Sequence, residues 1–138
     1  MILIFGLGCR NLPVMNLPLA FICYSDIHPG SQLANRLLDQ GYRVQNLAQD
    51  DDIAARVRDE KPILAIIEIV EGDEGVLDLI RKIRSEESTA HLPVLGYASA
   101  KKPDLQDAGR SAGASLVAAS EGLLDQLGSL LEHILQVD

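Results

Sequence analysis

The stretch from Lys61 to Ile69 constrains the fold of this chain more than any other part of it. Its apolar residues run from Ile63 to Ile67 and continue at Ile69, without the polar alternation of a half-exposed strand. An apolar run of this kind is typical of a strand buried on both faces, such as the central strand of a parallel sheet covered by helices. Its single carboxylate, Glu68, stands at the carboxyl end. Because ligands bind at the carboxyl ends of strands in open α/β sheets, Glu68 is a candidate site residue.

Composition and charge narrow the class of protein. A chain of 138 residues that is 47% hydrophobic can bury the core of one domain. A net charge of −8 argues against nucleic acid as a direct partner, since phosphate backbones require a basic face. The apolar opening, residues 1–9, is too short to span a bilayer, and no basic residue precedes it as in a signal peptide. We therefore expect a soluble, cytoplasmic protein without a membrane partner.

Strand-like and helix-like segments alternate along the rest of the chain. We expect a loop over residues 25–30, and Ser31 is expected to cap the helix that follows. A glycine within the fourth helix, Gly109, is expected to weaken it. The alternation predicts a doubly wound parallel sheet in a single three-layer α/β/α domain. The expected strands are 19–24, 42–47, 61–69, 92–98 and 114–118, and the expected helices are 31–40, 50–57, 76–83, 105–112 and 123–134.

Short motifs at fixed spacing carry a resemblance to a known family. They are Gly41-Tyr42, Lys61-Pro62, Arg81-Lys82-Ile83-Arg84, His91-Leu92-Pro93-Val94 and Gly113-Ala114. With these motifs the chain resembles the receiver domain of bacterial two-component response regulators over roughly residues 17 to 136. The resemblance implies a flavodoxin-like, five-stranded sheet in the order 2-1-3-4-5. It also implies that residues 1–16 form an extension outside the core and that residues 17–138 form the receiver-like domain.

The positions that carry receiver chemistry are all changed. The resemblance places Glu68 where the family has the aspartate that accepts a phosphoryl group from a histidine kinase. Ser25 and Asp26 stand where an acidic pair holds Mg²⁺, so at most one carboxylate remains. Ala98 replaces the hydroxyl residue that binds the phosphoryl oxygens, and Ser120 replaces the lysine that completes the pocket. This combination is the pattern of a degenerate receiver.

Three further positions belong to the same comparison. Glu121 stands where the family has a proline, and Val117 replaces the switch aromatic of the fifth strand. Ser99, one residue beyond Ala98, is expected to point away from the pocket. Glu68 itself can be a built-in mimic of a phosphorylated aspartate or only a carboxylate at an open pocket.

These residues predict a stand-alone pseudo-receiver: a non-enzymatic signalling or adaptor module that acts through protein contacts, without aspartyl phosphorylation and without a cofactor. Asp26 and His28 are too few ligands to predict a metal site. Two alternatives stay open. One is a receiver with residual phosphoacceptor function at Glu68 or Asp26, and the other is a flavodoxin-like module that binds a small ligand.

The resemblance also implies where a partner binds. In the family, the surface of the fourth helix, fifth strand and fifth helix meets partners or a second copy. Mixed charges on this surface favour a reversible interface, although ordinary solvated helix surface has the same composition. The residues concerned are Lys101, Lys102, Asp107, Arg110, Asp125, Glu132 and His133. A second apolar feature, the run from Ile2 to Leu7, would be an exposed patch unless it docks on a neighbour or on the sheet edge.

Overall fold

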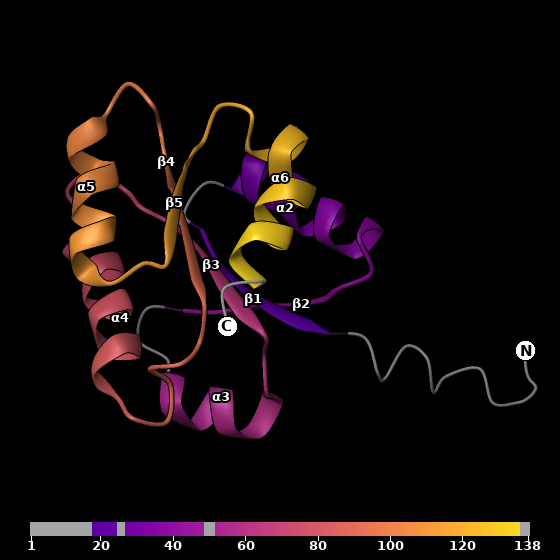
Figure 1. Ribbon diagram of the computed structural model, residues 1–138, viewed down its shortest axis with the longest axis vertical. Helices are drawn as coiled ribbons and strands as arrows, with labels where there is room; N and C mark the ends of the chain where they lie inside the picture. Colours follow the sequence, from indigo (N-terminus) through magenta and orange to yellow (C-terminus); the bar gives the residue numbers. More distant parts are fainter. Residues whose placement is uncertain (1–17, 25–26, 49–51, 136–138) are drawn as a thin grey trace, which may run out of the picture.

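The computed structural model describes residues 18–24, 27–48 and 52–135, and within them strands and helices alternate (Figure 1). A single parallel sheet has the strand order β2-β1-β3-β4-β5, which confirms the predicted flavodoxin-like fold and order. The elements are β1 (Leu19–Cys23), α2 (Ile27–Asp39), β2 (Arg43–Asn46), α3 (Ile53–Glu60), β3 (Leu64–Glu68), α4 (Glu74–Ser85), β4 (Val94–Ala98), α5 (Pro103–Ala112), β5 (Leu116–Ala119) and α6 (Leu123–Leu135).

Helices cover both faces of the sheet, so the domain has three layers. α3, α4 and α5 pack on one face, and α2 and α6 pack on the other (Figure 1). The central strand supplies both cores: Ala65 and Ile67 enter the first, and Leu64 and Ile66 enter the second. All four side chains are fully buried, which confirms the prediction made from the uninterrupted apolar run.

The predicted start of the first helix was wrong. α2 begins at Ile27, so residues 27–30 are helical, and Ser31 lies inside the helix instead of capping it. Pro29 falls in the first turn, where a helix does not use the backbone N–H that proline lacks. The end of the helix was predicted correctly: Gly41 has a φ of +93°, and the amide of Tyr42 donates to the carbonyl of Leu37 at 3.0 Å.

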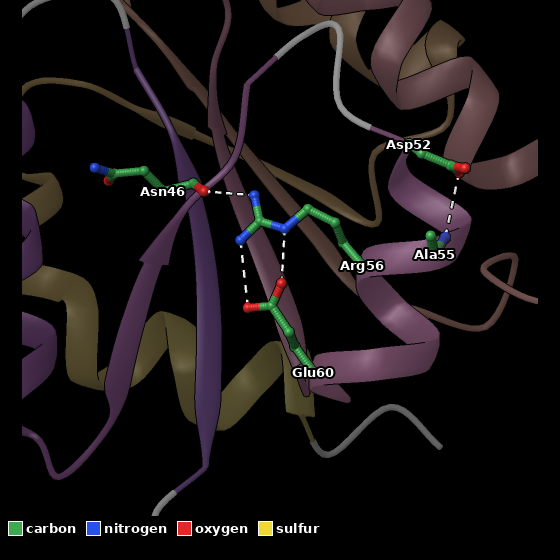
Figure 2. Close-up of polar contacts among 5 residues, drawn as sticks. All are labelled: Asn46, Asp52, Ala55, Arg56 and Glu60. Carbon is green, nitrogen blue, oxygen red and sulfur yellow. Dashed lines mark hydrogen bonds and ion pairs between the residues drawn. The ribbon is translucent and has the colours of Figure 1, made fainter.

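Two other boundaries also differ from the predicted ones. α3 begins at Ile53, and the carboxylate of Asp52 caps it by accepting a hydrogen bond from the amide of Ala55 at 3.2 Å (Figure 2). β5 begins at Leu116 because Ala114 still belongs to the turn that follows α5, where its amide donates to the carbonyl of Gly109 at 3.1 Å. Asp50 and Asp51, at the start of the expected helix 50–57, lie outside the described residues.

Gly109 has a packing role that the sequence pattern did not indicate. It is buried on the face of α5 that lies against the sheet, and a methyl group there would collide with Cδ1 of Ile69. Ile69 follows β3 directly and is 3% exposed, so it has little room to move. The glycine lets α5 approach the end of the central strand.

We expect Gly109→Ala to destabilise the domain by about 1–2 kcal/mol, because the cost of overpacking exceeds the gain of about 1 kcal/mol in helix propensity. Gly128→Ala in α6 is the matched control, since its new methyl group would meet only the Gln40 side chain at 3.5 Å, and it should stabilise the domain. Chemical denaturation measures both. Adding Ile69→Val should recover part of the loss at Gly109, and equal effects at the two glycines would contradict this explanation.

Candidate functional site at the carboxyl edge of the sheet

Three neighbouring strands end together at the carboxyl edge of the sheet. Glu68 is the last residue of β3 and is paired in register with Tyr97 of β4, while Ala98 is paired with Ala119 of β5. The Glu68 side chain is half-buried. Parallel pairing therefore brings the ends of β3, β4 and β5 to one edge, where the sequence had placed Glu68, Ala98 and Ser120.

The side chains predicted to stand at the receiver's chemical positions offer little to a phosphoryl group. Ala98 is 2% exposed and has no hydroxyl, and its carbonyl accepts hydrogen bonds from the amide of Ser120 at 2.9 Å and from Nε2 of Gln106 at 3.1 Å. The Ser120 side chain is exposed and carries no charge. Ser25 and Asp26, the other predicted pocket residues, lie outside the described residues.

The carboxylate of Glu121, noted in the sequence only as the replacement of a proline, links two loops at this edge by hydrogen bonds. The hydroxyl of Ser99 donates to Oε2 of Glu121 at 2.5 Å, and the amide of Ala100 donates to Oε1 at 2.8 Å. The Ser99 hydroxyl in turn accepts the amide of Lys101 at 3.1 Å. Glu121 thus occupies the hydrogen-bond donors that follow β4.

These contacts change the acidity of Glu121. The hydrogen bond from the Ala100 amide, followed by that from the Ser99 hydroxyl, lowers the pKa of Glu121 to about 2, because both donors favour the charged carboxylate. The folded pKa lies below the usual value of 4.5. The hydrogen bonds of Glu121 therefore contribute fully to the stability of the fold above pH 4.5, and this contribution is lost as the pH falls through about 2.

An NMR titration of the side-chain carboxyls should find Glu121 still ionised near pH 3. Ser99→Ala removes one of the two main donors, so we expect this variant to raise the Glu121 pKa part of the way toward its usual value. Ser111→Ala, an exposed serine on α5, is the matched control and should leave the pKa unchanged. A wild-type titration midpoint near 4.5 would show that the carboxylate does not hold these donors in solution.

An ion pair also crosses this edge. Nζ of Lys102 contacts Oε1 of Glu71, which joins the loop after β4 to the loop after β3. This hydrogen bond, with the charge of Lys102, lowers the pKa of Glu71. Both side chains are at least half exposed, so the pair adds little to stability. It nevertheless commits the amino group of Lys102 to a carboxylate of this chain.

Comparison with solved structures identifies the fold. The receiver domain of NtrX from Brucella abortus matches with a TM-score of 0.73 and 20% identity, over 86% of this chain and 99% of that one. A response regulator from Thermotoga maritima matches with a TM-score of 0.70 and 24% identity, over 87% and 98% of the two chains. The chemotaxis protein CheY4 of Vibrio cholerae matches with a TM-score of 0.71 and 15% identity, over 86% and 98%. The chain has the fold of a receiver domain. No protein-family model matches its sequence, and no curated protein does.

The predicted partner residues flank the last strand of this receiver fold. α5 and α6 lie beside β5 on opposite faces of the sheet (Figure 1). Asp107 and Arg110 pair with each other at 2.8 Å within α5. All seven predicted residues are exposed: Lys101, Lys102, Asp107, Arg110, Asp125, Glu132 and His133. Their use by a partner stays a prediction.

The described residues form neither a metal-ligand cluster nor a helix that could span a membrane. Across residues 18–24, 27–48 and 52–135, no three side chains of histidine, cysteine, aspartate or glutamate are grouped as a metal ion would need. Within the same residues, every helix is too short or too polar to cross a bilayer.

Proposed function

We propose that this chain is a pseudo-receiver: a signalling or adaptor module of the cytoplasm that acts through protein contacts and is not phosphorylated. The observation that supports this most strongly is that the carboxylate of Glu121 accepts hydrogen bonds from the donors that follow β4. In a site that accepts a phosphoryl group, donors at the end of a strand would face the incoming oxygens. Here the hydroxyl of Ser99 and the amide of Ala100 bind a carboxylate of the same chain instead.

The charges at the edge support the same proposal. Phosphoryl transfer depends on positioning the reactants and on neutralising the charge of the transferred group. Lys102 pairs with Glu71, and the position of the pocket lysine is taken by Ser120. Ala98 adds no hydroxyl. The developing negative charge would then lack both a lysine at residue 120 and a hydroxyl at residue 98 to stabilise it.

Treatment with acetyl phosphate and Mg²⁺, followed by intact-protein mass spectrometry, tests the proposal. We expect no added phosphoryl mass on the wild-type chain, with a phosphorylatable receiver in the same tube as the positive control. A phosphoryl mass that appears on the wild type and disappears in Glu68→Gln would instead establish a receiver with residual phosphoacceptor function.

The partner surface needs a separate experiment. We propose that α5, β5 and α6 bind a protein partner or a second copy through a polar, reversible interface. The double variant Arg110→Glu/Asp125→Lys should abolish binding of a partner captured by pull-down. Arg58→Glu/Asp59→Lys makes the same charge changes at an exposed pair on α3 and serves as the matched control. Full affinity in the first variant would place the interface elsewhere.

A further inference from the structure

A groove lies between α2 and β2 at the edge of the sheet. It has a volume of about 360 Å³, and none of its lining side chains carries a charge. Leu38, on the rim, is 54% exposed and is the large apolar side chain that stands out to solvent within the described residues. The lining residues are Tyr24, Ser31, Ala34, Asn35, Leu38, Val44, Gln45 and Asn46. The lining is neutral and mixes hydroxyl and amide side chains with apolar ones, so the groove suits an uncharged segment better than a charged one.

The neighbouring strand can add another strand. The amide of Arg43 donates to the carbonyl of Pro18, just before β1, at 2.7 Å, and the amide of Leu47 donates to the carbonyl of Ile22 in β1 at 2.8 Å; the register of the pair follows this alternation. The amides of Val44 and Asn46 therefore face away from β1, toward the edge of the sheet. Such an edge is a template for pairing with an extended segment.

Figure 2 shows that part of this edge is already covered from the other face of the sheet. Nη1 of Arg56 donates to the carbonyl of Asn46 at 2.7 Å. Glu60 holds the same guanidinium at 2.7 Å, and the group lies 4.8 Å from the centre of the Phe21 ring. Arg56 covers the edge on the α3 side, whereas the groove opens on the α2 side. A segment that pairs with β2 would place its apolar side chains in the groove.

The chain carries a segment of matching chemistry ahead of Pro18 in the sequence. The run Ile2-Leu3-Ile4-Phe5-Gly6-Leu7 has no charged residue, and the described chain begins at Pro18, whose carbonyl accepts the amide of Arg43 at the start of β2. Residues 8–17 connect the two and can span roughly 30 Å when extended. The outer side of β2 is only about 10 Å from β1, because adjacent strands lie about 4.8 Å apart.

We propose that residues 2–7 of the same chain dock along the open edge of β2, with their apolar side chains in the groove between α2 and β2. The connector enters near the start of β2, so the docked segment would run antiparallel to it. A short tether of this kind gives an effective concentration in the millimolar range. The segment of the same chain therefore outcompetes the segment of a second copy at ordinary protein concentrations. This docking covers the edge without entering either core.

Amide hydrogen exchange on the full chain tests the proposal. We expect the Val44 and Asn46 amides to be protected at least about tenfold relative to the variant Ile4→Asp/Phe5→Asp, which places charges in the docking segment. Leu38→Arg should cause the same loss by blocking the groove. Two matched controls, Asn11→Asp in the connector and Gln32→Arg on an exposed position of α2 outside the groove, should keep the protection.

Each outcome decides the proposal. Docking within one chain is supported if both test variants lose the protection and if the protection of the wild type stays the same on hundredfold dilution of the protein. Protection that falls on dilution identifies a second copy as the occupant and overturns the proposal. Equal exchange in the wild type and in Ile4→Asp/Phe5→Asp also overturns it, because residues 2–7 then do not cover β2. Thermal unfolding of all variants separates local exposure of the edge from a general loss of stability.

Discussion

Replacing Arg84 with methionine should lower the melting temperature of this domain by roughly 10 °C, the largest loss we expect from a single side chain outside the two cores. The Arg84 guanidinium leaves α4 and donates to four acceptors of other segments. Nε bonds the carbonyl of Gly113 at 2.5 Å, Nη1 bonds the carbonyls of Ala90 and Leu92 at 2.6 and 2.9 Å, and Nη2 bonds Oγ of Ser115 at 2.6 Å. It therefore fastens α4 to the loops before β4 and β5.

The size of the expected effect follows from the type of bond. A hydrogen bond to a charged group contributes about 1.5–3 kcal/mol, and bonds that share one donor group are not additive. We expect a total of about 2–4 kcal/mol, which for a chain of this length corresponds to roughly 10 °C. The loss should extend to β4 through Ser115. Its hydroxyl accepts Nη2 of Arg84 and also the amide of Val94, the first residue of β4, at 3.1 Å.

Two variants control this experiment. Arg81→Met removes the same functional group from an exposed position of α4, where Arg81 pairs with Asp78 at 2.7 Å, and should change the melting temperature by only a degree or two. Arg84→Lys keeps the charge and loses the planar fork of donors, so it should resemble Arg84→Met more than the wild type. Similar melting temperatures for Arg81→Met and Arg84→Met would refute the fastening role of Arg84.

The sheet could be predicted from the sequence because burial on both faces leaves a pattern that few other structures share. β3 has no polar residue before Glu68, whereas the edge strand β2 is largely exposed and mostly polar. The start of α2 could not be predicted as well. Gly30 and Pro29 are typical of loops, yet the first turn of a helix accepts both at little cost.

The contacts of the candidate site could not be predicted for a different reason. Ser99 and Glu121 are 22 residues apart, Glu71 and Lys102 are 31 apart, and Arg84 and Gly113 are 29 apart. Periodicity describes one element at a time and gives no information on which loops meet. The resemblance to receivers predicts which positions lack receiver chemistry, but it treated Glu121 only as the loss of a proline.

Restoring a single receiver residue at this edge should not make the chain a phosphoryl acceptor. Glu68→Asp restores the carboxylate that receivers use, and it moves the carboxylate by about one C–C bond, a displacement of about 1 Å that can change a rate roughly a hundredfold. We nevertheless expect no Mg²⁺-dependent labelling of Glu68→Asp by acetyl phosphate. The acidic partner at Ser25, the hydroxyl at Ala98 and the lysine at Ser120 would still be missing.

The matched positive variant carries five changes: Glu68→Asp, Ser25→Asp, Ala98→Thr and Ser120→Lys, with Glu121→Pro to free the donors that follow β4. Mg²⁺ needs several oxygen ligands in near-octahedral geometry, and the added lysine neutralises charge on the transferred group. We expect this variant to gain a phosphoryl mass under conditions in which Glu68→Asp gains none, with circular dichroism confirming that both are folded. Labelling of Glu68→Asp alone would mean that residue 68 is the one change that prevents phosphorylation and that the rest of the edge still supports phosphoryl transfer. The proposed pseudo-receiver function would then be wrong.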